Sequence, residues 1–171
     1  MVRLDSFSVD FDCTKEAPYF QVPQEQRIRF VMEDLSVSLI RGVIEDVYDA
    51  GDALTVIFVS EYIVNNRRRS FKSRIGRSVK ITNWQETVVY DESLREGIVY
   101  TSIRNLIRED VITYCSAIYK GQNEAFLAFY NEKFLVYVSS DVIDIISSDR
   151  GLIAELKQGY SGLFNRFYED S

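Results

Sequence analysis

The chain has no histidine among its 171 residues. This absence excludes Ser-His-Asp and Cys-His catalysis as well as the H-E-x-x-H zinc site. The sequence also lacks the motifs G-x-x-x-x-G-K-[ST] and G-x-G-x-x-G, which cradle phosphates and dinucleotides. Because no catalytic signature is present, we predict a non-enzymatic protein that uses no cofactor.

Proline and cysteine are scarce. The only prolines, Pro18 and Pro23, predict a connector between an opening strand at about residues 4–11 and the rest of the domain. Cys13 and Cys115 lie far apart and belong to no C-x-x-C motif, so the sequence does not support a metal knuckle or a redox pair. We expect both thiols to be reduced and packed, although a disulfide between them stays open.

Long hydrophobic runs are missing. The longest, such as the run around Val56–Val59, span about five residues, whereas a helix that crosses a bilayer needs about 20. The N-terminal Met1–Phe7 carries charged residues and has no apolar core typical of a secretory signal. We therefore expect a cytoplasmic protein with no membrane contact.

The composition is that of a globular protein. Apolar residues make up 46% of the chain, with eleven Phe and eleven Tyr among them. A disordered chain would be poorer in such residues. Because the length suits one core, we predict a single domain over residues 1–171.

Alternating polar and apolar residues predict strands at residues 27–30 and 35–39. Further strands are predicted at residues 4–11, 43–48, 53–59, 78–82 and 86–90, of which 43–48 and 53–59 flank a turn-rich segment. For residues 35–39 a helix is the competing interpretation, and Gly42 would suit a bulge. Three further segments with short polar stretches between them predict an antiparallel meander, at residues 111–119, 124–130 and 133–138.

Two segments have helical spacing. Val99, Ile103 and Leu106 would share one face of a central helix at residues 92–108, which Asp91 could cap. A second apolar stripe predicts an amphipathic C-terminal helix at residues 149–168, with its last two members packed on the sheet; the stripe consists of Ile153, Leu156, Tyr160, Leu163, Phe164 and Phe167. The predicted class is α+β, a largely antiparallel sheet with both helices on one face.

The charge is unevenly distributed. The net charge is −6, yet no Asp or Glu occurs between Tyr62 and Gln85. Seven cations gather there, and the remaining 13 bases against 26 acids leave −13 on the rest of the molecule. The candidate binding residues of this basic stretch are Arg67, Arg68, Arg69, Phe71, Lys72, Arg74, Arg77 and Lys80.

Three hypotheses fit the basic stretch. It could form a solvated strand edge or hairpin tip, where cations discourage unwanted edge pairing. It could dock on an acidic protein surface through bidentate arginine contacts. It could also be a flexible loop that binds nucleic-acid phosphates, with Phe71 stacked on a base.

Carboxylates are the remaining candidates for chemistry. Asp10 and Asp12 would share one face of a strand, and Asp46, Asp49 and Asp52 surround a predicted turn. Neither group has the ligand spacing of an EF-hand. Ordinary turn and edge roles are therefore the expectation, and we predict no metal site.

Aromatic residues of the predicted meander invite a recognition role, because aromatics and arginine dominate binding hot spots. They are Tyr114, Tyr119, Phe126, Phe129, Tyr130, Phe134 and Tyr137. Both faces of the meander could be packed internally, or one could contact another protein or a second copy. We predict a protein-binding module of the adaptor, inhibitor or immunity type, with an acidic, aromatic-bearing surface. The alternative is a nucleic-acid-binding protein that contacts phosphates through residues 67–80.

Overall fold

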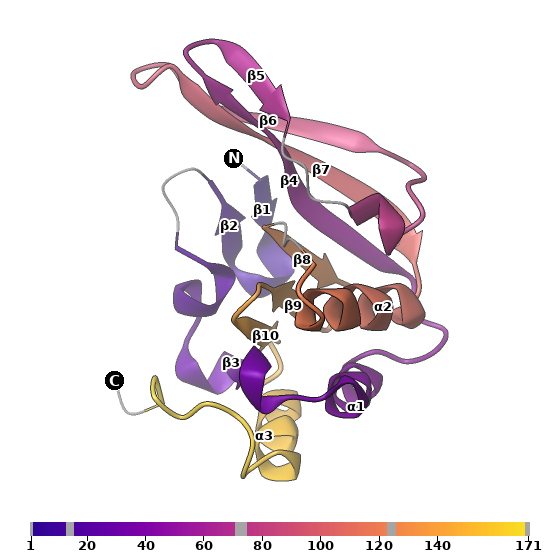
Figure 1. The fold of residues 1–171 in the computed structure, drawn as a ribbon. Helices are drawn as coiled ribbons and strands as arrows, with labels where there is room; N and C mark the ends of the chain where they lie inside the picture. The colour runs from indigo at the N-terminus through magenta and orange to yellow at the C-terminus, as the bar shows by residue number, and fades with distance from the viewer. Residues whose placement is uncertain (1, 13–15, 71–74, 123–125, 170–171) are drawn as a thin grey trace.

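The computed structural model describes residues 2–12, 16–70, 75–122 and 126–169. Within these residues, eight strands form one antiparallel sheet in the order β3-β10-β9-β8-β4-β7-β6, and β5 pairs with β4. A separate two-stranded hairpin lies against this sheet, as do three α-helices (Figure 1). This is the predicted α+β class.

The elements have the following bounds. The strands of the large sheet are β3 (Arg27–Val31), β4 (Leu54–Val64), β5 (Arg67–Ser70), β6 (Gln85–Asp91), β7 (Glu96–Leu106), β8 (Leu127–Tyr130), β9 (Leu135–Val138) and β10 (Val142–Ile146). The separate hairpin consists of β1 (Val2–Leu4) and β2 (Val9–Phe11). The helices are α1 (Val37–Val47), α2 (Arg108–Tyr119) and α3 (Arg150–Gly159), with 3₁₀ turns η1 (Asp5–Phe7), η2 (Pro18–Gln21), η3 (Gln24–Gln26), η4 (Met32–Asp34) and η5 (Ile75–Arg77).

The two faces of the sheet bury two separate apolar clusters. Alternate residues of β9 divide between them, since Val136 and Val138 face the helices whereas Leu135 and Tyr137 face the β1–β2 hairpin. Both faces of the β8–β9–β10 meander are therefore packed internally. The meander does not present an open aromatic face.

Helix α1 replaces two predicted strands. Residues 35–39 alternate in polarity, but the segment that follows places Ile40, Val43 and Ile44 on one helical face, and all three are buried. The Ser36 hydroxyl caps this helix by accepting a hydrogen bond from the Leu39 amide at 3.2 Å. The strand prediction was wrong here, the competing helix is correct, and Gly42 lies inside α1 rather than at a bulge.

The predicted central helix at residues 92–108 is also wrong. This segment contains the β6–β7 turn and the whole of β7, in which Val99, Thr101 and Ile103 are buried in alternation. The apolar residues Val99, Ile103 and Leu106 are three or four positions apart, as on a helix face, but they belong to a strand. The helix begins later, at Arg108, and includes residues 111–119, which the sequence predicted as the first meander strand.

Other boundaries also differ from the predictions. The opening segment forms two short strands around η1 instead of one strand over residues 4–11. Residues 78–82 form an irregular segment. The predicted strands at 27–30, 53–59, 86–90 and 133–138 correspond to β3, β4, β6 and β9, and β8 lies within the predicted 124–130.

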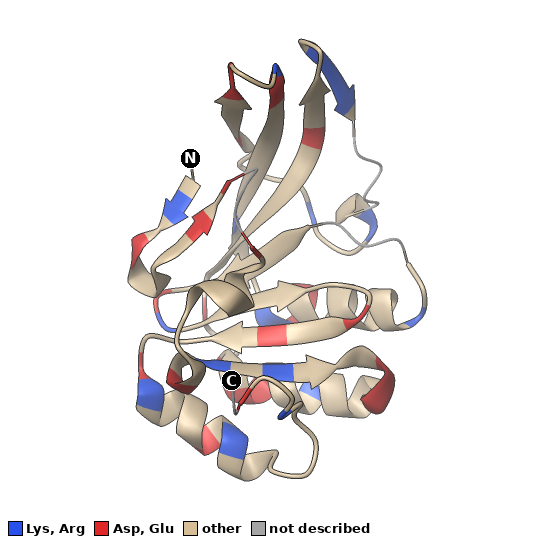
Figure 2. Cartoon of the chain, turned by 90° about the vertical axis from the view of Figure 1, so that its left-hand side faces the viewer, with Lys and Arg blue, Asp and Glu red and all other residues tan. Residues whose placement is uncertain are grey.

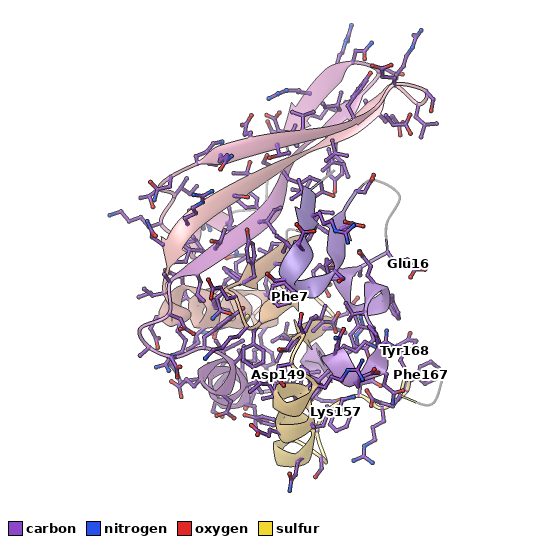
Figure 3. The ribbon with its side chains drawn as sticks, turned by 180° about the vertical axis from the view of Figure 1, so that it is seen from behind. Phe7, Glu16, Asp149, Lys157, Phe167 and Tyr168 are labelled. Carbon is purple, nitrogen blue, oxygen red and sulfur yellow. The ribbon has the colours of Figure 1, made fainter. Side chains whose placement is uncertain are left out.

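The C-terminal helix is shorter than predicted. Asp149 caps α3 by accepting a hydrogen bond from the Gly151 amide at 2.8 Å, and the helix ends at Gly159. Phe164 still packs against the core, as predicted. Phe167 does not, because its side chain is 78% exposed at the end of the described chain, where it touches Tyr168 (Figure 3). None of the helices in the described parts is long and apolar enough to span a bilayer.

Candidate protein-binding surface

One part of the sheet projects beyond the meander, and we call it the β-arm: residues 60–70 and 84–100. Strand β4 pairs with β8 only over Thr55–Phe58, and its outer part, Glu61–Val64, pairs with β5 instead. Strand β7 follows β4 along its whole length, and β6 lies outside β7. The β-arm therefore extends away from the helices, at the top of Figure 1.

A two-residue turn connects β4 to β5. Asn65 and Asn66 have φ values of 51° and 61°. Positive φ at both central residues is the requirement of a type I′ hairpin turn, and asparagine tolerates this conformation better than most residues. The Asn-Asn pair was thus a turn signal in the sequence, directly before the three arginines that form β5.

The β6–β7 hairpin is closed by a capped turn. The Asp91 carboxylate accepts hydrogen bonds from the Ser93 amide at 2.8 Å and the Leu94 amide at 3.2 Å. Hydrogen bonds from Ser93 and Leu94 lower the pKa of Asp91, because they stabilise its ionised form. Asp91, predicted to cap a helix, caps a turn.

The two hairpins of the β-arm contact each other at Tyr90. Its hydroxyl donates a hydrogen bond to the Asn66 side chain. Its ring lies over Gly97, where an added Cβ would be 2.9 Å from Tyr90 Cδ2 and 2.6 Å from the Val89 carbonyl oxygen. Gly97 therefore permits a close approach of β6 to β7 that no other residue would allow.

Arg68 is held in a small polar network on one face of the β-arm. Its guanidinium lies 3.3 Å from Glu61 and 3.4 Å from Glu86. The same Glu86 accepts a hydrogen bond from Trp84 Nε1 at 3.2 Å. Arg68 is thus partly neutralised within the chain, although exposed pairs of this kind each stabilise the fold by only about 0–1 kcal/mol.

The other cations of the basic stretch are differently placed. Arg67 and Arg69 point to the face opposite Arg68, because neighbouring residues of a strand alternate. Both are exposed, as are Arg77 and Lys80, and β5 marks a cationic segment near the outer end of the β-arm (Figure 2).

The second half of the basic stretch is anchored to the body. Ile75 and Val79 are buried in the helix-side cluster, so residues 75–80 follow the surface of the molecule. The remaining predicted binding residues, Phe71, Lys72 and Arg74, lie outside the described residues.

Exposed apolar side chains gather on the β-arm. Trp84 is 48% exposed, Val88 44% and Tyr90 39%, all on the face that carries Arg68. Leu94 at the hairpin tip is 61% exposed, and Tyr62 lies on the opposite face. The sequence predicted an aromatic recognition surface on the meander and not on the β-arm. Only the tertiary structure distinguishes buried from exposed aromatic residues.

Two of the candidate carboxylates, Asp46 and Asp52, have structural roles. Asp52 accepts hydrogen bonds from the Asp49 amide at 3.0 Å and the Asn131 side chain at 3.1 Å, and so closes a turn. Asp46 belongs to α1 and accepts from the Tyr160 hydroxyl at 2.6 Å. Among the described residues no cluster of three or more His, Cys, Asp or Glu side chains could hold a metal ion.

A groove of about 630 Å³ lies between η1 and the β8–β9 turn. Its charged lining is mixed, with Arg3 and Lys133 near Asp5, Asp52 and Glu132. Its two cations and three carboxylates largely cancel, so the groove does not select an ionic ligand of either sign.

Comparison with known proteins adds no further constraint. No protein-family model matches the chain, and neither the curated proteins nor the solved structures give a match.

Proposed function

We propose that the protein is a non-enzymatic protein-binding module of the adaptor, inhibitor or immunity type, and that the β-arm makes the contact. The observation that carries this proposal is the group of exposed apolar side chains on the β-arm, Trp84, Val88, Tyr90 and Leu94. Exposed aromatic side chains have few rotatable bonds, so they lose little conformational entropy on binding, and they are typical of binding hot spots.

The negative charge of this chain favours a partner with a basic surface. The chain carries a net charge of −6, and the β-arm face with Trp84 includes Glu61 and Glu86. Complementary charge speeds association and disfavours wrong partners. Glu61 and Glu86 outnumber Arg68, the cation that pairs with both, so the apolar anchors of this face would suit a protein whose apolar patch has a basic rim.

Capture from nuclease-treated lysate of the source organism tests this proposal. The arm variant combines Trp84→Ser with Leu94→Ser, and the matched control combines Val37→Ser with Leu39→Ser, two exposed apolar residues of α1. Loss of hot-spot side chains should reduce capture of a specific protein by about tenfold or more in the arm variant. The α1 control should capture as much as the parent, and equal capture by all three proteins would contradict the proposal.

A second candidate is nucleic-acid binding through β5. Arg67 and Arg69 favour it, because both are exposed on the β-arm face that lacks the Arg68 ion pairs, and Tyr62 is paired with Arg69 on that face. Arginines beside an aromatic ring are suited to phosphate contact and base stacking. The charge of −13 outside the basic stretch opposes this function.

A further inference from the structure

Among the described residues, three strands of the sheet have one side without a neighbouring strand, and they differ in how that side is protected. The outer side of β3 is covered by the C-terminal segment, where the Asn165 amide donates to the Arg29 carbonyl at 2.8 Å. Strand β5 is only four residues long and three of them are arginine. Short length and cationic side chains both discourage strand pairing.

Strand β6 has none of these protections. It is seven residues long and contains no Lys, Arg or Pro. In the strand order of the described residues, β6 is the last strand and β7 is its one neighbour. Six of its seven residues are not buried. An exposed strand of this length without protection is a template for another strand.

We infer that β6 is a docking strand, and that its occupant is β6 of a second copy of this chain. The inference rests on the proposed role of the β-arm as a recognition surface. The two strands would run antiparallel, with Val88 opposite Val88 of the second copy. The two large sheets would then form one continuous sheet with a two-fold axis through the centre of the new pair.

This register uses the whole strand. The cross-strand pairs are Gln85 with Asp91, Glu86 with Tyr90, Thr87 with Val89, and Val88 with itself. In a strand, every second residue directs its backbone N–H and C=O groups to the same side. Each proposed pair joins two odd-numbered or two even-numbered residues, so the groups on the open side of one strand face those of the other. No acidic side chain lies opposite another, which would be destabilising.

Side chains on the Arg68 face would be covered in this pair. Val88 would contact its copy, and Tyr90 would lie opposite Glu86 of the second copy. Trp84 is on the same face, since it donates to Glu86 and its ring centre is 6.1 Å from that of Phe58. The exposed apolar residues of β6 would therefore be removed from water together.

The opposite face supplies charge complementarity. Arg104 is exposed on β7, and its Nη2 donates to Gln85 Oε1 at 3.4 Å. The proposed register places Asp91 of the second copy beside Gln85, and hence beside this guanidinium. The two-fold axis repeats the contact, so two opposite-charge pairs flank the central valines. This complementarity is the reason to favour a second copy over a strand of another protein.

Sedimentation velocity tests the inference, at protein concentrations from about 1 to 200 µM, where small interfaces dissociate. The parent should change from monomer to dimer over this range. Val88→Glu should weaken dimerisation by about tenfold or more, because it places two carboxylates against each other. Val37→Glu, on an exposed valine of α1, adds the same charge and should dimerise like the parent.

A mixture tests the register. Val88→Lys alone should also be monomeric, but an equal mixture with Val88→Glu should dimerise, since only a pair centred on residue 88 places the two new charges together. A parent that stays monomeric, a dimer that Val88→Glu leaves intact, an equal loss in Val37→Glu, or a mixture that stays monomeric would each overturn the inference. Circular dichroism of each variant shows whether it folds, and parent dimerisation tests the inference without any variant.

The two proposals can fail separately. A monomeric parent whose lysate capture still depends on Trp84 and Leu94 would overturn the β6 pair and leave the proposed function standing. A dimer that captures no other protein would overturn the proposed function and support the pair.

Discussion

Arg29 and Asp144 form a bidentate ion pair inside the sheet. Arg29 Nε lies 2.6 Å from one carboxylate oxygen of Asp144, and Nη2 lies 2.8 Å from the other. The two residues are directly opposite on β3 and β10, and 115 positions separate them in sequence. The guanidinium also lies 4.0 Å from the ring centre of Tyr19. A bidentate pair of this kind satisfies the buried carboxylate.

We expect Arg29→Met to destabilise the fold by about 3–5 kcal/mol, because it leaves a buried carboxylate without its partner. The double variant Arg29→Met with Asp144→Leu should recover much of this loss, since it removes both charges. Urea denaturation of the parent and both variants measures the free energies of unfolding. A single variant as stable as the parent would show that the pair does not hold β3 to β10.

The loss of stability in the single variant Arg29→Met should increase with pH. Burial raises the pKa of Asp144 above its ordinary value, even with Arg29 in place. The folded state then binds the proton more tightly than the unfolded state, so this group's contribution to stability falls as pH rises above the unfolded pKa. Arg29→Met should therefore lose more stability near pH 8 than near pH 4, as urea titrations over that range would show. An equal loss at both pH values would contradict the role assigned to the carboxylate.

Cys115 should be chemically inert in the folded protein. It is fully buried in α2, and burial raises the pKa of its thiol to about 12. Because the thiolate is the reactive form, we expect no reaction with a thiol reagent at neutral pH until the protein unfolds. The Cys13→Ser variant isolates this thiol, and the same reaction in denaturant is its control. Rapid labelling under native conditions would show that α2 opens.

Gly97→Ala should destabilise the β-arm. An added Cβ would be 2.6 Å from the Val89 carbonyl oxygen, which belongs to the backbone of β6. Overpacking of this kind costs about 1–3 kcal/mol. Gly159→Ala is the matched control, because its added Cβ would lie in open space. Thermal unfolding compares the two, and faster amide exchange in β6 and β7 of Gly97→Ala would place the change in the β-arm.

Phe164 and Phe167 should respond differently to truncation. A fully buried phenylalanine loses about 3–5 kcal/mol on replacement by alanine, so the half-buried Phe164 should lose less, about 1–3 kcal/mol. Phe167 is 78% exposed and should lose no more than about 0.5 kcal/mol. Equal losses for the two alanine variants in urea denaturation would contradict this assignment.

Oligonucleotide binding separates the two proposed functions. Replacement of Arg67, Arg68 and Arg69 by Ser should keep the fold, because all three are exposed on β5. Fluorescence anisotropy with single- and double-stranded oligonucleotides should show only weak binding by the parent, which is lost between about 50 and 150 mM salt. Submicromolar binding that survives the higher salt and disappears in the triple variant would favour the nucleic-acid function.

Some strands and helices could be predicted from their own residues alone. Alternation predicted β3, the polar stretch before residue 133 marked the start of the strand that contains β9, and Asp149 marked the start of α3, because its side chain caps a helix from within the same segment. The basic stretch around Arg67 was likewise identified by counting charges along the chain, since such a count depends only on residue type and order.

Where the spacing of apolar residues fits both a helix and a strand, tertiary structure decided which of the two forms. Val99 and Ile103 are compatible with either a helix or a strand, and pairing of β7 with both β4 and β6 selects the strand. The open side of β6 was equally invisible in the sequence, since it depends on the order of all eight strands. Apolar spacing is local, whereas pairing, burial and exposed edges depend on residues brought together from distant parts of the chain.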